Sequence, residues 1–171
     1  MKKKMSYIYI FKSFLIICGP KGRFIIDLKS KVLNSKIFLN NNELFFIDYD
    51  KKTYEERLIG LLQNSIRGVN LSFSKKVSLV GIGFRCWTIF ENSKKFLIVK
   101  TSLSKDCIIY VPQTIDVFCL NSTTIFIMGI EKADVNSFVL SIKRIKKPNF
   151  YKQKGIFLEN EIIKTKVGKK M

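Results

Sequence analysis

The chain of 171 residues contains no histidine, which narrows the chemistry that its side chains can perform. Histidine is the commonest general base at neutral pH and the commonest metal ligand in proteins. Its absence excludes Ser-His and Cys-His catalytic pairs, zincin sites and His-based zinc chemistry. No convergent pair of carboxylates or cysteines at a useful spacing replaces it. We therefore expect a protein that is not an enzyme and that has no cofactor, no metal site and no small-molecule substrate.

The cysteines offer little alternative chemistry. Cys18, Cys86, Cys107 and Cys119 lie far apart in the sequence, and no two of them form a C-x-x-C pair. Each lies in an apolar run, so we interpret all four as small buried hydrophobic residues of a protein in a reducing compartment. A metal site built from cysteines alone is the alternative interpretation.

Cationic side chains are the chemistry that this sequence does supply. Its 31 Lys and Arg residues outnumber 13 Asp and Glu residues, giving a formal net charge of +18. Residues 143–171 carry ten basic residues and two acidic ones, so a net charge of +8 lies in this C-terminal segment. Lysines neutralise phosphates and release condensed counterions, which makes a polyanion the expected partner.

The aromatic residues of this segment favour a nucleic acid over a membrane surface. Phe150 and Tyr151 lie among the lysines and could stack on bases or sugars. Binding to a membrane surface requires an amphipathic helix, which Pro148, Gly155 and Gly168 argue against. The simpler alternative is that the charged run is a solvated face without a ligand.

A second unusual feature is a glycine-containing apolar stretch, which we predict to be part of one strand over Val77–Trp87. Strand alternation places Gly81, Gly83 and Arg85 on the same face. Glycine weakens a strand unless another backbone must come close, so this face is expected to receive an RNA sugar–phosphate chain. Tight packing against another protein element is the alternative. The stretch is not a dinucleotide-binding fingerprint, because the third glycine is absent.

The N-terminus has three lysines before an apolar run, as a secretion signal does. Lys12 interrupts that run, which is then too short to span a bilayer, and no cleavage site of small residues follows. We expect these residues to form the first strands of a soluble domain without membrane insertion.

The first half of the chain is expected to contain strands and one helix. A β-hairpin is predicted across the turn Gly19–Gly22. For the helix, Thr53 and Glu56 form a capping box, apolar residues follow at helical spacing to Val69, and Gly68 is the expected C-terminal cap. The predicted strands are Phe14–Cys18, Arg23–Leu28, Ile37–Leu39 and Glu43–Asp48.

The second half repeats this order. A shift of 80 residues aligns the strand pairs and the helix faces of the two halves, which indicates a duplication. After Val77–Trp87 the predicted strands are Lys95–Thr101, Cys107–Val111, Val117–Leu120 and Thr124–Met128, and a helix begins at Asp134 and ends before Pro148. We predict an α+β fold of two duplicated small domains, residues 1–75 and 76–148, each an antiparallel sheet with one helix, and a basic C-terminal tail over 149–171.

Several blocks resemble one family, the bacterial-type sixth protein of the large ribosomal subunit. Ile17–Gly22 is similar to the family's strand ending in Gly-Pro-x-Gly, and Leu61–Val69 is similar to the end of its first helix. Lys75–Arg85 resembles its stretch Leu-x-Leu-Val-Gly-x-Gly-Tyr-Arg. Lys146–Ile156 resembles Arg-Lys-Pro-Glu-Pro-Tyr-Lys-Gly-Lys-Gly-Ile, and Glu161–Lys170 follows the basic ending.

The resemblance implies a structural constituent of the large subunit that supports translation. Its partners would be large-subunit rRNA near the sarcin–ricin loop and the stalk base, and the neighbouring ribosomal proteins there. An RNA-binding factor that is not a stable part of the ribosome is the alternative. By matching position, the RNA contacts expected from the resemblance are Gly81, Gly83, Arg85, Lys147, Tyr151, Lys152, Lys154 and Gly155. Neighbouring residues complete the expected set: Lys146, Pro148, Lys164, Lys166, Lys169 and Lys170.

The chain also departs from the family pattern. Ser102–Asp106 aligns with the family's Gly-Tyr-Ser-His-Pro loop and keeps only the serine, although Lys105 could still reach a phosphate. The composition is rich in Lys, Ile, Phe and Asn, whose codons are A/T-rich, and very poor in Ala. These features together indicate a ribosome of a mitochondrion, with a plastid or a bacterial cytoplasm as alternatives.

Overall fold

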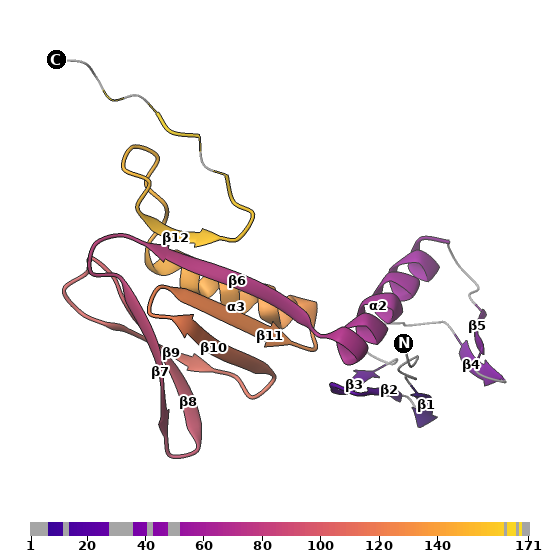
Figure 1. The fold of residues 1–171 in the computed structure, drawn as a ribbon. Coiled ribbons are helices and arrows are strands. Elements are labelled where there is room, and N and C mark those ends of the chain that lie inside the picture. The colour runs from indigo at the N-terminus through magenta and orange to yellow at the C-terminus, as the bar shows by residue number, and fades with distance from the viewer. Residues whose placement is uncertain are drawn as a thin grey trace, which may run out of the picture. The chain divides into compact units, whose positions relative to one another are not determined.

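A computed structural model of the chain describes residues 7–11, 14–27, 36–40, 43–47, 52–162, 164–166 and 168. Side chains are described at all of these positions except 36–40, 43–47, 52–55, 57 and 58. The chain divides into two compact units, Met1–Phe73 and Ser74–Met171. Figure 1 shows a helix together with β-strands in the described part of each unit. The predicted α+β class, with sheets and one helix in each half, is confirmed.

The strands of the first unit form a three-stranded antiparallel sheet and a separate hairpin. Gly19 pairs with Gly22, so Pro20 and Lys21 make a two-residue turn, as the predicted hairpin requires. The sheet has the order β1 (Tyr7–Phe11), β2 (Phe14–Gly19) and β3 (Gly22–Asp27), and the hairpin consists of β4 (Lys36–Asn40) and β5 (Glu43–Ile47).

The helix of this unit, α2 (Lys52–Leu71), packs against β2 and β3. Alternate strand residues point toward it, and Leu15, Ile17 and Ile26 are at most 2% exposed. A Cβ atom on Gly19 would overlap Cγ1 of Val69, so glycine allows the strand to approach the helix closely. The N–H of Lys21 also donates a hydrogen bond to the Val69 carbonyl (3.0 Å). Burial along one sheet face therefore fixes the last turns of α2.

The predicted end of this helix is wrong. Gly68 is buried inside α2, and the helix continues to Leu71. Ser72 then takes the left-handed conformation (φ 56°) that was expected at glycine. The close contact between Val69 and Gly19 extends the helix past the position at which local sequence alone would end it. The cap predicted at the other end is also misplaced, because α2 begins at Lys52 and Thr53 lies inside the helix. The side chain of Thr53 is outside the described part of the structure.

The described residues of the second unit form seven strands, in two sheets, and one helix. Figure 1 shows how these elements are arranged. The first sheet has the order β10 (Ile115–Asn121), β11 (Thr124–Gly129), β6 (Phe73–Val80) and β12 (Gly155–Leu158). The second sheet has the order β7 (Arg85–Glu91), β8 (Lys94–Lys100) and β9 (Cys107–Val111), all antiparallel.

The helix of the second unit, α3 (Lys132–Ile145), contacts β11 and β12. Its buried residues are Val135, Phe138, Val139 and Ile142, which are the residues predicted for its apolar face. It begins 80 residues after α2, at Lys132 as against Lys52, so the repeat seen in the sequence coincides with the helix starts.

The prediction of a single strand over Val77–Trp87 is wrong. β6 ends at Val80 and β7 begins at Arg85, with a turn between them. Gly81 (φ 156°) and Gly83 (φ 78°) take conformations that other residues rarely adopt. The turn buries Phe84 (5% exposed) and leaves Ile82 in solvent (88% exposed), although strand alternation would put both on one face. The two glycines therefore serve a turn, and the predicted glycine face of a strand does not exist.

The segment predicted to be a tail contains a strand that the sequence analysis did not predict. β12 pairs antiparallel with β6, from Gly155 opposite Val80 to Leu158 opposite Val77. Ile156 has no exposed surface. A four-residue strand is too short to show a periodic pattern, and it depends on a partner strand far away in the sequence. The basic C-terminal segment is thus anchored to the sheet by its middle residues.

The cysteines differ from one another in burial. All four are free thiols, but Cys86 alone is buried and the other three are half-buried, so the prediction that all are buried is wrong for three. The Cys86 sulfur lies 3.2 Å from the Ser122 carbonyl oxygen, and a hydrogen bond with Cys119, together with burial, raises the pKa of Cys86. That hydrogen bond and the Lys95 ammonium lower the pKa of Cys119 to about 7, although burial opposes this.

Lys95 is a structural lysine. Its ammonium donates to the Val117 carbonyl at 2.5 Å, and it lies 5.1 Å from the ring centroid of Phe118 and 5.3 Å from that of Phe90. These contacts join β8 to β10, which belong to different sheets of the unit. The ammonium of Lys95 is therefore already engaged in contacts within the protein. Within the described part of the chain, no helix has the length and apolar character needed to cross a membrane.

Truncation of Ile156 should destabilise the second unit. We expect Ile156→Ala to lower the free energy of unfolding by about 2–5 kcal/mol, because it leaves a cavity between β12 and the helix. Ile162→Ala, at a 93% exposed side chain, should change it by less than about 0.5 kcal/mol. Urea unfolding followed by the fluorescence of the single tryptophan, Trp87, measures both. Equal changes in the free energy of unfolding for the two variants would show that β12 is not anchored as described.

Cys119 should be the thiol that reacts near neutral pH. The thiolate is the reactive form, so alkylation of Cys119 by iodoacetamide should rise about tenfold per pH unit below a midpoint near 7 and then level off. Lys95→Met removes a stabilising cation and should move that midpoint to higher pH. Mass spectrometry of the modified peptides gives the rate for each cysteine. A wild-type midpoint at 8.5 or above would contradict the described environment.

Candidate nucleic-acid interface

Three segments of the second unit converge at one end of its sheets (Figure 1). The turn 81–84 follows Val80, whose partner in the sheet is Gly155, so this turn lies beside the loop that precedes β12. Arg85 begins β7 opposite Lys100, the last residue of β8, and the loop 101–106 follows directly. Strand register thus brings together residues near positions 83, 103 and 151, which are remote in sequence.

The loop between α3 and β12 is closed by its own hydrogen bonds. The N–H of Asn149 donates to the Lys154 carbonyl (2.9 Å), and the N–H of Gln153 donates to the Asn149 carbonyl (3.0 Å). The Asn149 side-chain oxygen accepts from the N–H groups of Tyr151 (2.8 Å) and Lys152 (3.3 Å). One asparagine therefore organises the whole turn, as short polar side chains do in tight loops.

Glycine is required where this loop joins the strand. Gly155 is buried with φ 145°, and a Cβ atom there would lie 2.7 Å from Cα of Pro148 and 3.0 Å from the Lys147 carbonyl oxygen. The Ile156 N–H reaches the Lys146 carbonyl at 3.2 Å. Gly155 and Pro148 shape the loop, while the residues between them supply its exposed chemistry.

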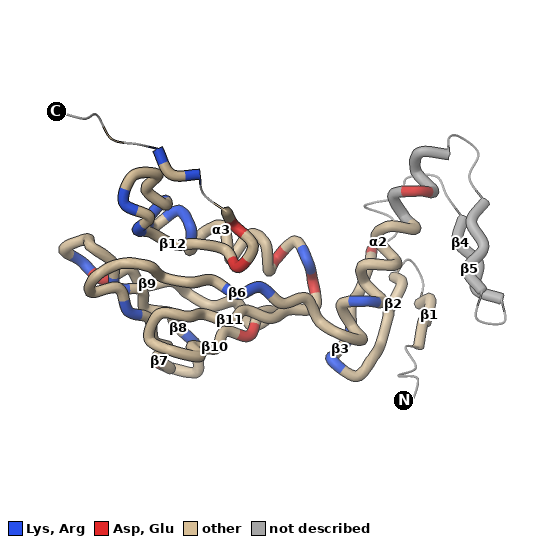
Figure 2. The backbone as a smooth tube through the Cα atoms, turned by 45° about the horizontal axis from the view of Figure 1, so that its top comes forward, with Lys and Arg blue, Asp and Glu red and all other residues tan. Residues whose placement is uncertain are grey.

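The exposed chemistry of this end is cationic and aromatic. Tyr151 is 62% exposed and Phe150 52% exposed. Lys147, Lys152 and Lys154 are exposed, and none of them forms an ion pair with any described carboxylate. In Figure 2 the Lys and Arg segments gather in this loop and at the adjoining ends of β7, β8 and β9. The loop thus offers charges that its own protein leaves unneutralised.

Arg85 and Lys100 form a second cationic group at the same end. They are directly opposite each other across β7 and β8, and both are exposed. Like charges in this position repel at a Cβ separation of about 5 Å, so an anion between them would relieve the repulsion. Lys105 lies exposed in the loop that follows Lys100. Lys100 was not predicted, because only the cross-strand register reveals that it faces Arg85.

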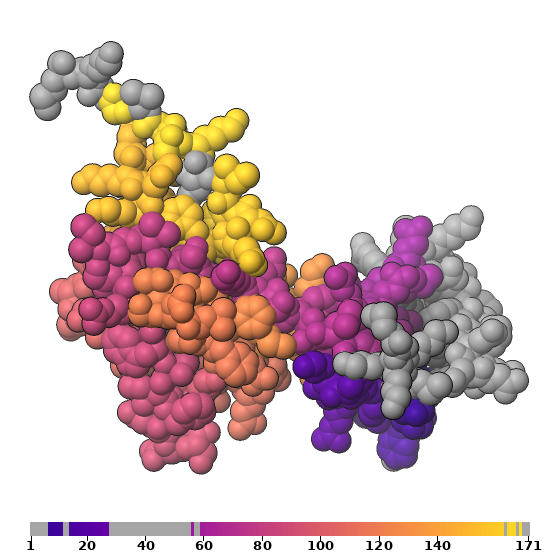
Figure 3. Space-filling view, in the orientation of Figure 1, coloured from indigo at the N-terminus to yellow at the C-terminus, as the bar shows by residue number. Residues whose placement is uncertain are grey.

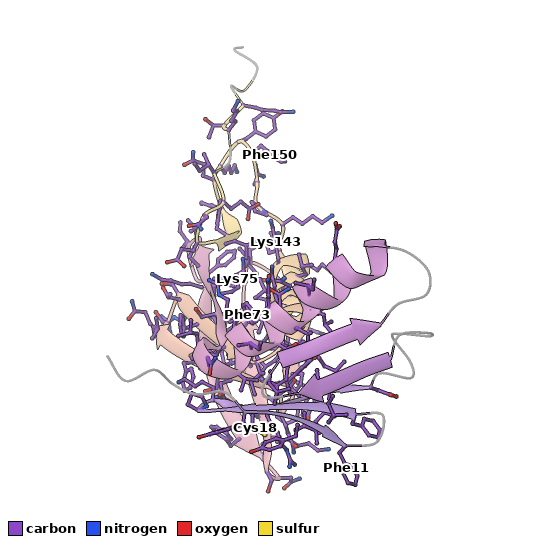
Figure 4. The ribbon with its side chains drawn as sticks, turned by 90° about the vertical axis from the view of Figure 1, so that its right-hand side faces the viewer. Phe11, Cys18, Phe73, Lys75, Lys143 and Phe150 are labelled. Atoms are coloured by element: carbon purple, nitrogen blue, oxygen red, sulfur yellow. The ribbon has the colours of Figure 1, made fainter. Side chains whose placement is uncertain are left out.

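Residues 158–162 and 164–166 return toward α3 and the loop before β12. Lys143 donates to Glu161 Oε1 at 2.6 Å, and the other carboxylate oxygen, Oε2, accepts from the Leu158 N–H at 3.3 Å. The Lys166 N–H donates to the Phe150 carbonyl at 3.2 Å, and its ammonium is 5.9 Å from the Phe150 ring centroid. Figure 4 labels Lys143 and Phe150, and Figure 3 shows this segment, in yellow, covering the edge of the unit along β6.

A groove of about 620 Å³ lies between α3 and this last segment. Because Glu161 neutralises Lys143, the free charges of the groove are basic. Its lining combines apolar and cationic side chains: Leu140, Pro148, Phe150 and Ile162 are apolar, and Arg144, Lys147, Lys164 and Lys166 are cationic.

The structure therefore places the predicted residues in two neighbouring groups. Lys164 and Lys166 line the groove, whereas Lys169 and Lys170 lie outside the described residues. In the part of the chain that the structure describes, no cluster of three or more Cys, Asp or Glu residues is placed to hold a metal ion. The converging end contains Gly81, Gly83, Arg85, Lys105, Lys146, Lys147, Pro148, Tyr151, Lys152, Lys154 and Gly155.

Comparison with known proteins identifies relatives along almost the whole chain. It is 32% identical to the large ribosomal subunit protein uL6 of Borrelia garinii subsp. bavariensis over 161 residues, covering 92% of this chain and 86% of the relative. It is 31% identical to uL6 of Syntrophus aciditrophicus, covering 90% and 84%. It is also 31% identical to uL6c of Guillardia theta, covering 91% and 85%. No family model matches.

Replacement of Gly155 should open the loop. Gly155→Ala places a Cβ atom against the Pro148 backbone in a conformation unfavourable for alanine, at a cost of about 1–3 kcal/mol. The amides of Asn149 and Gln153 should then exchange with deuterium roughly tenfold faster or more. Gly168→Ala, where nothing lies within 4 Å of the added atom, is the matched control and should leave these rates unchanged. Unchanged protection in Gly155→Ala would show that Gly155 does not hold the loop closed.

Proposed function

The chain belongs to the uL6 family of large ribosomal subunit proteins, and from this membership we propose that it is a structural constituent of that subunit and binds its rRNA. We assign the binding surface to the converging end of the second unit, together with the cationic residues that line the adjoining groove. The partner under this proposal is large-subunit rRNA, and the role is positional rather than catalytic.

The convergence of unpaired cations carries the proposal. Lys147, Lys152 and Lys154 come from one closed loop, and Arg85 and Lys100 come from the adjacent sheet. Because the loop and the strand ends already hold the backbone in place, binding has to order only the side chains. The RNA backbone, with its regularly spaced phosphates, is the polyanion that such an array fits, and release of its counterions would drive association.

The exposed aromatic side chains support RNA in particular. Tyr151 lies between lysines at the tip of the loop, where a base or sugar could stack on its ring while the lysines contact phosphates. The turn at Gly81 and Gly83 would contribute its tight backbone rather than a strand face. The proposed contact is therefore a loop-and-turn surface that receives a folded RNA backbone.

The location within the ribosome follows from the family resemblance. We place the chain near the sarcin–ricin loop and the stalk base, beside the ribosomal proteins there. The abundance of residues with A/T-rich codons favours a mitochondrial ribosome, and a plastid or bacterial ribosome is the alternative. Retention on the large subunit through a high-salt wash tests the assignment to the subunit. Release into the supernatant, with RNA binding retained, would instead indicate an RNA-binding factor outside the ribosome.

Charge removal in the loop should weaken RNA binding and its salt dependence. We expect the double variant Lys152→Gln/Lys154→Gln to reduce the slope of log K against log salt by about 2, since each lost phosphate contact reduces it by about 1. Filter binding to large-subunit rRNA at several salt concentrations measures this slope.

The matched control is Lys94→Gln/Lys132→Gln, which removes the same charge. Lys94 is exposed at the turn between β7 and β8, and Lys132 is exposed at the start of α3, whereas the loop follows the end of that helix. Lys95 is unsuitable as a control because it holds β8 to β10. Equal slopes for the two double variants would contradict the assignment of the loop to RNA.

A further inference from the structure

The three-stranded sheet of the first unit has an aromatic outer face. Its inner face, with Leu15, Ile17 and Ile26, is buried against α2. Alternation along the strands places the intervening residues on the other side. Tyr9, Ile16 and Ile25 lie directly opposite one another across the three strands. Tyr7 and Phe11 flank Tyr9 on β1, and Phe14 lies opposite Phe11. We call this set, Tyr7, Tyr9, Phe11, Phe14, Ile16 and Ile25, the aromatic face.

The aromatic face is exposed to solvent. Tyr7, Tyr9 and Phe11 are 55%, 56% and 61% exposed, and Ile25 is 50% exposed. Figure 4 shows Phe11 projecting from the sheet on the side away from the helix of this unit. The outward face of an antiparallel sheet normally carries polar residues. Contiguous apolar surface of this kind marks an interaction site in a water-soluble protein.

The charge of the aromatic face identifies the kind of partner. Among its described neighbours on the same side of the sheet, the charged residues are Arg23 and Asp27, which have opposite signs. Within the described residues the face is thus nearly neutral, in a chain of net charge +18. A nucleic acid or an anionic membrane would require a cationic surface, which this chain concentrates elsewhere. Neutral aromatic and aliphatic side chains, with tyrosine hydroxyls beside them, are typical of protein–protein interfaces.

We propose that the aromatic face binds another protein of the large subunit through an uncharged apolar surface on that protein. The proposal rests on the proposed function in so far as the partner belongs to the same subunit. It assigns different partners to the two units of the chain: RNA to the cationic end of the second unit, and protein to the sheet of the first. The contact with RNA would be driven by charge, and the contact with protein by burial of apolar surface.

Photocrosslinking in the assembled subunit tests both assignments separately. The photoreactive residue p-benzoylphenylalanine replaces Tyr9 in one full-length variant and Tyr151 in another, and each variant is incorporated into large subunits. After irradiation, the Tyr9 variant should give a product that survives ribonuclease and contains a peptide of a second ribosomal protein. The Tyr151 variant should give a product with rRNA.

The outcomes distinguish the two ideas. A Tyr9 product with rRNA, with a second copy of this chain or with lipid would overturn the assignment of the aromatic face, and so would the absence of any product. A missing rRNA product at Tyr151 alone would count against the proposed function and leave the protein partner at Tyr9 intact.

The salt dependence of retention on the subunit gives an independent measurement. Tyr9→Thr/Ile25→Thr keeps residues that favour strands and changes exposed positions, so the fold should persist. Apolar contacts are not screened by salt, so this variant should be retained less than the wild type by a similar factor at low and high salt. For Lys152→Gln/Lys154→Gln, the difference in retention on the subunit between variant and wild type should become smaller as the salt concentration rises. Retention equal to the wild type at all salt concentrations would show that the aromatic face makes no stabilising contact.

Discussion

The pairing of β12 with β6 is the interaction on which the candidate site depends. It buries Ile156 completely and places Gly155 opposite Val80, so the loop before β12 is held beside the turn that follows β6. Without this pairing, the lysines around position 150 would lie on a chain end free to avoid the other cations. Apolar burial at two or three residues thus overcomes the repulsion among many charges, because hydrophobic contacts are short-ranged and dense while exposed charges are screened by solvent.

The arrangement of charge in the second unit separates structural cations from available ones. Lys143 and Lys76 pair with Glu161 and Glu159, and Lys95 is held by a carbonyl and two aromatic rings. These lysines stabilise the unit, and the acidic residues of the last segment are used to hold it in place. Of the remaining cations, Arg85, Lys100, Lys147, Lys152 and Lys154 face solvent at one end, where their mutual repulsion is a cost that a polyanion would remove. The net charge of +18 is therefore partly structural and partly free for a ligand.

The two units follow one plan, a helix packed on a face of an antiparallel sheet, with different outer surfaces. In the first unit the residues of β1–β3 that face away from α2 are mainly aromatic and aliphatic, and the charged ones, Arg23 and Asp27, have opposite signs. In the second unit the strand ends and the segment after α3 are cationic. A duplicated scaffold leaves its solvent-facing positions free to vary, because burial constrains only alternate residues of each strand and one stripe of each helix.

The sequence by itself determined the features that depend on neighbouring residues. The hairpin at Gly19–Gly22 and the apolar face of α3 follow from turn chemistry and from helical periodicity, and the structure has both. The tertiary structure decided the features that depend on residues brought together from afar. It ended α2 after Gly68, turned the chain at Gly81 and Gly83, formed β12, and placed Lys100 opposite Arg85. Local patterns constrain a single segment, whereas strand register and the closeness of charges arise only when separate segments are buried together.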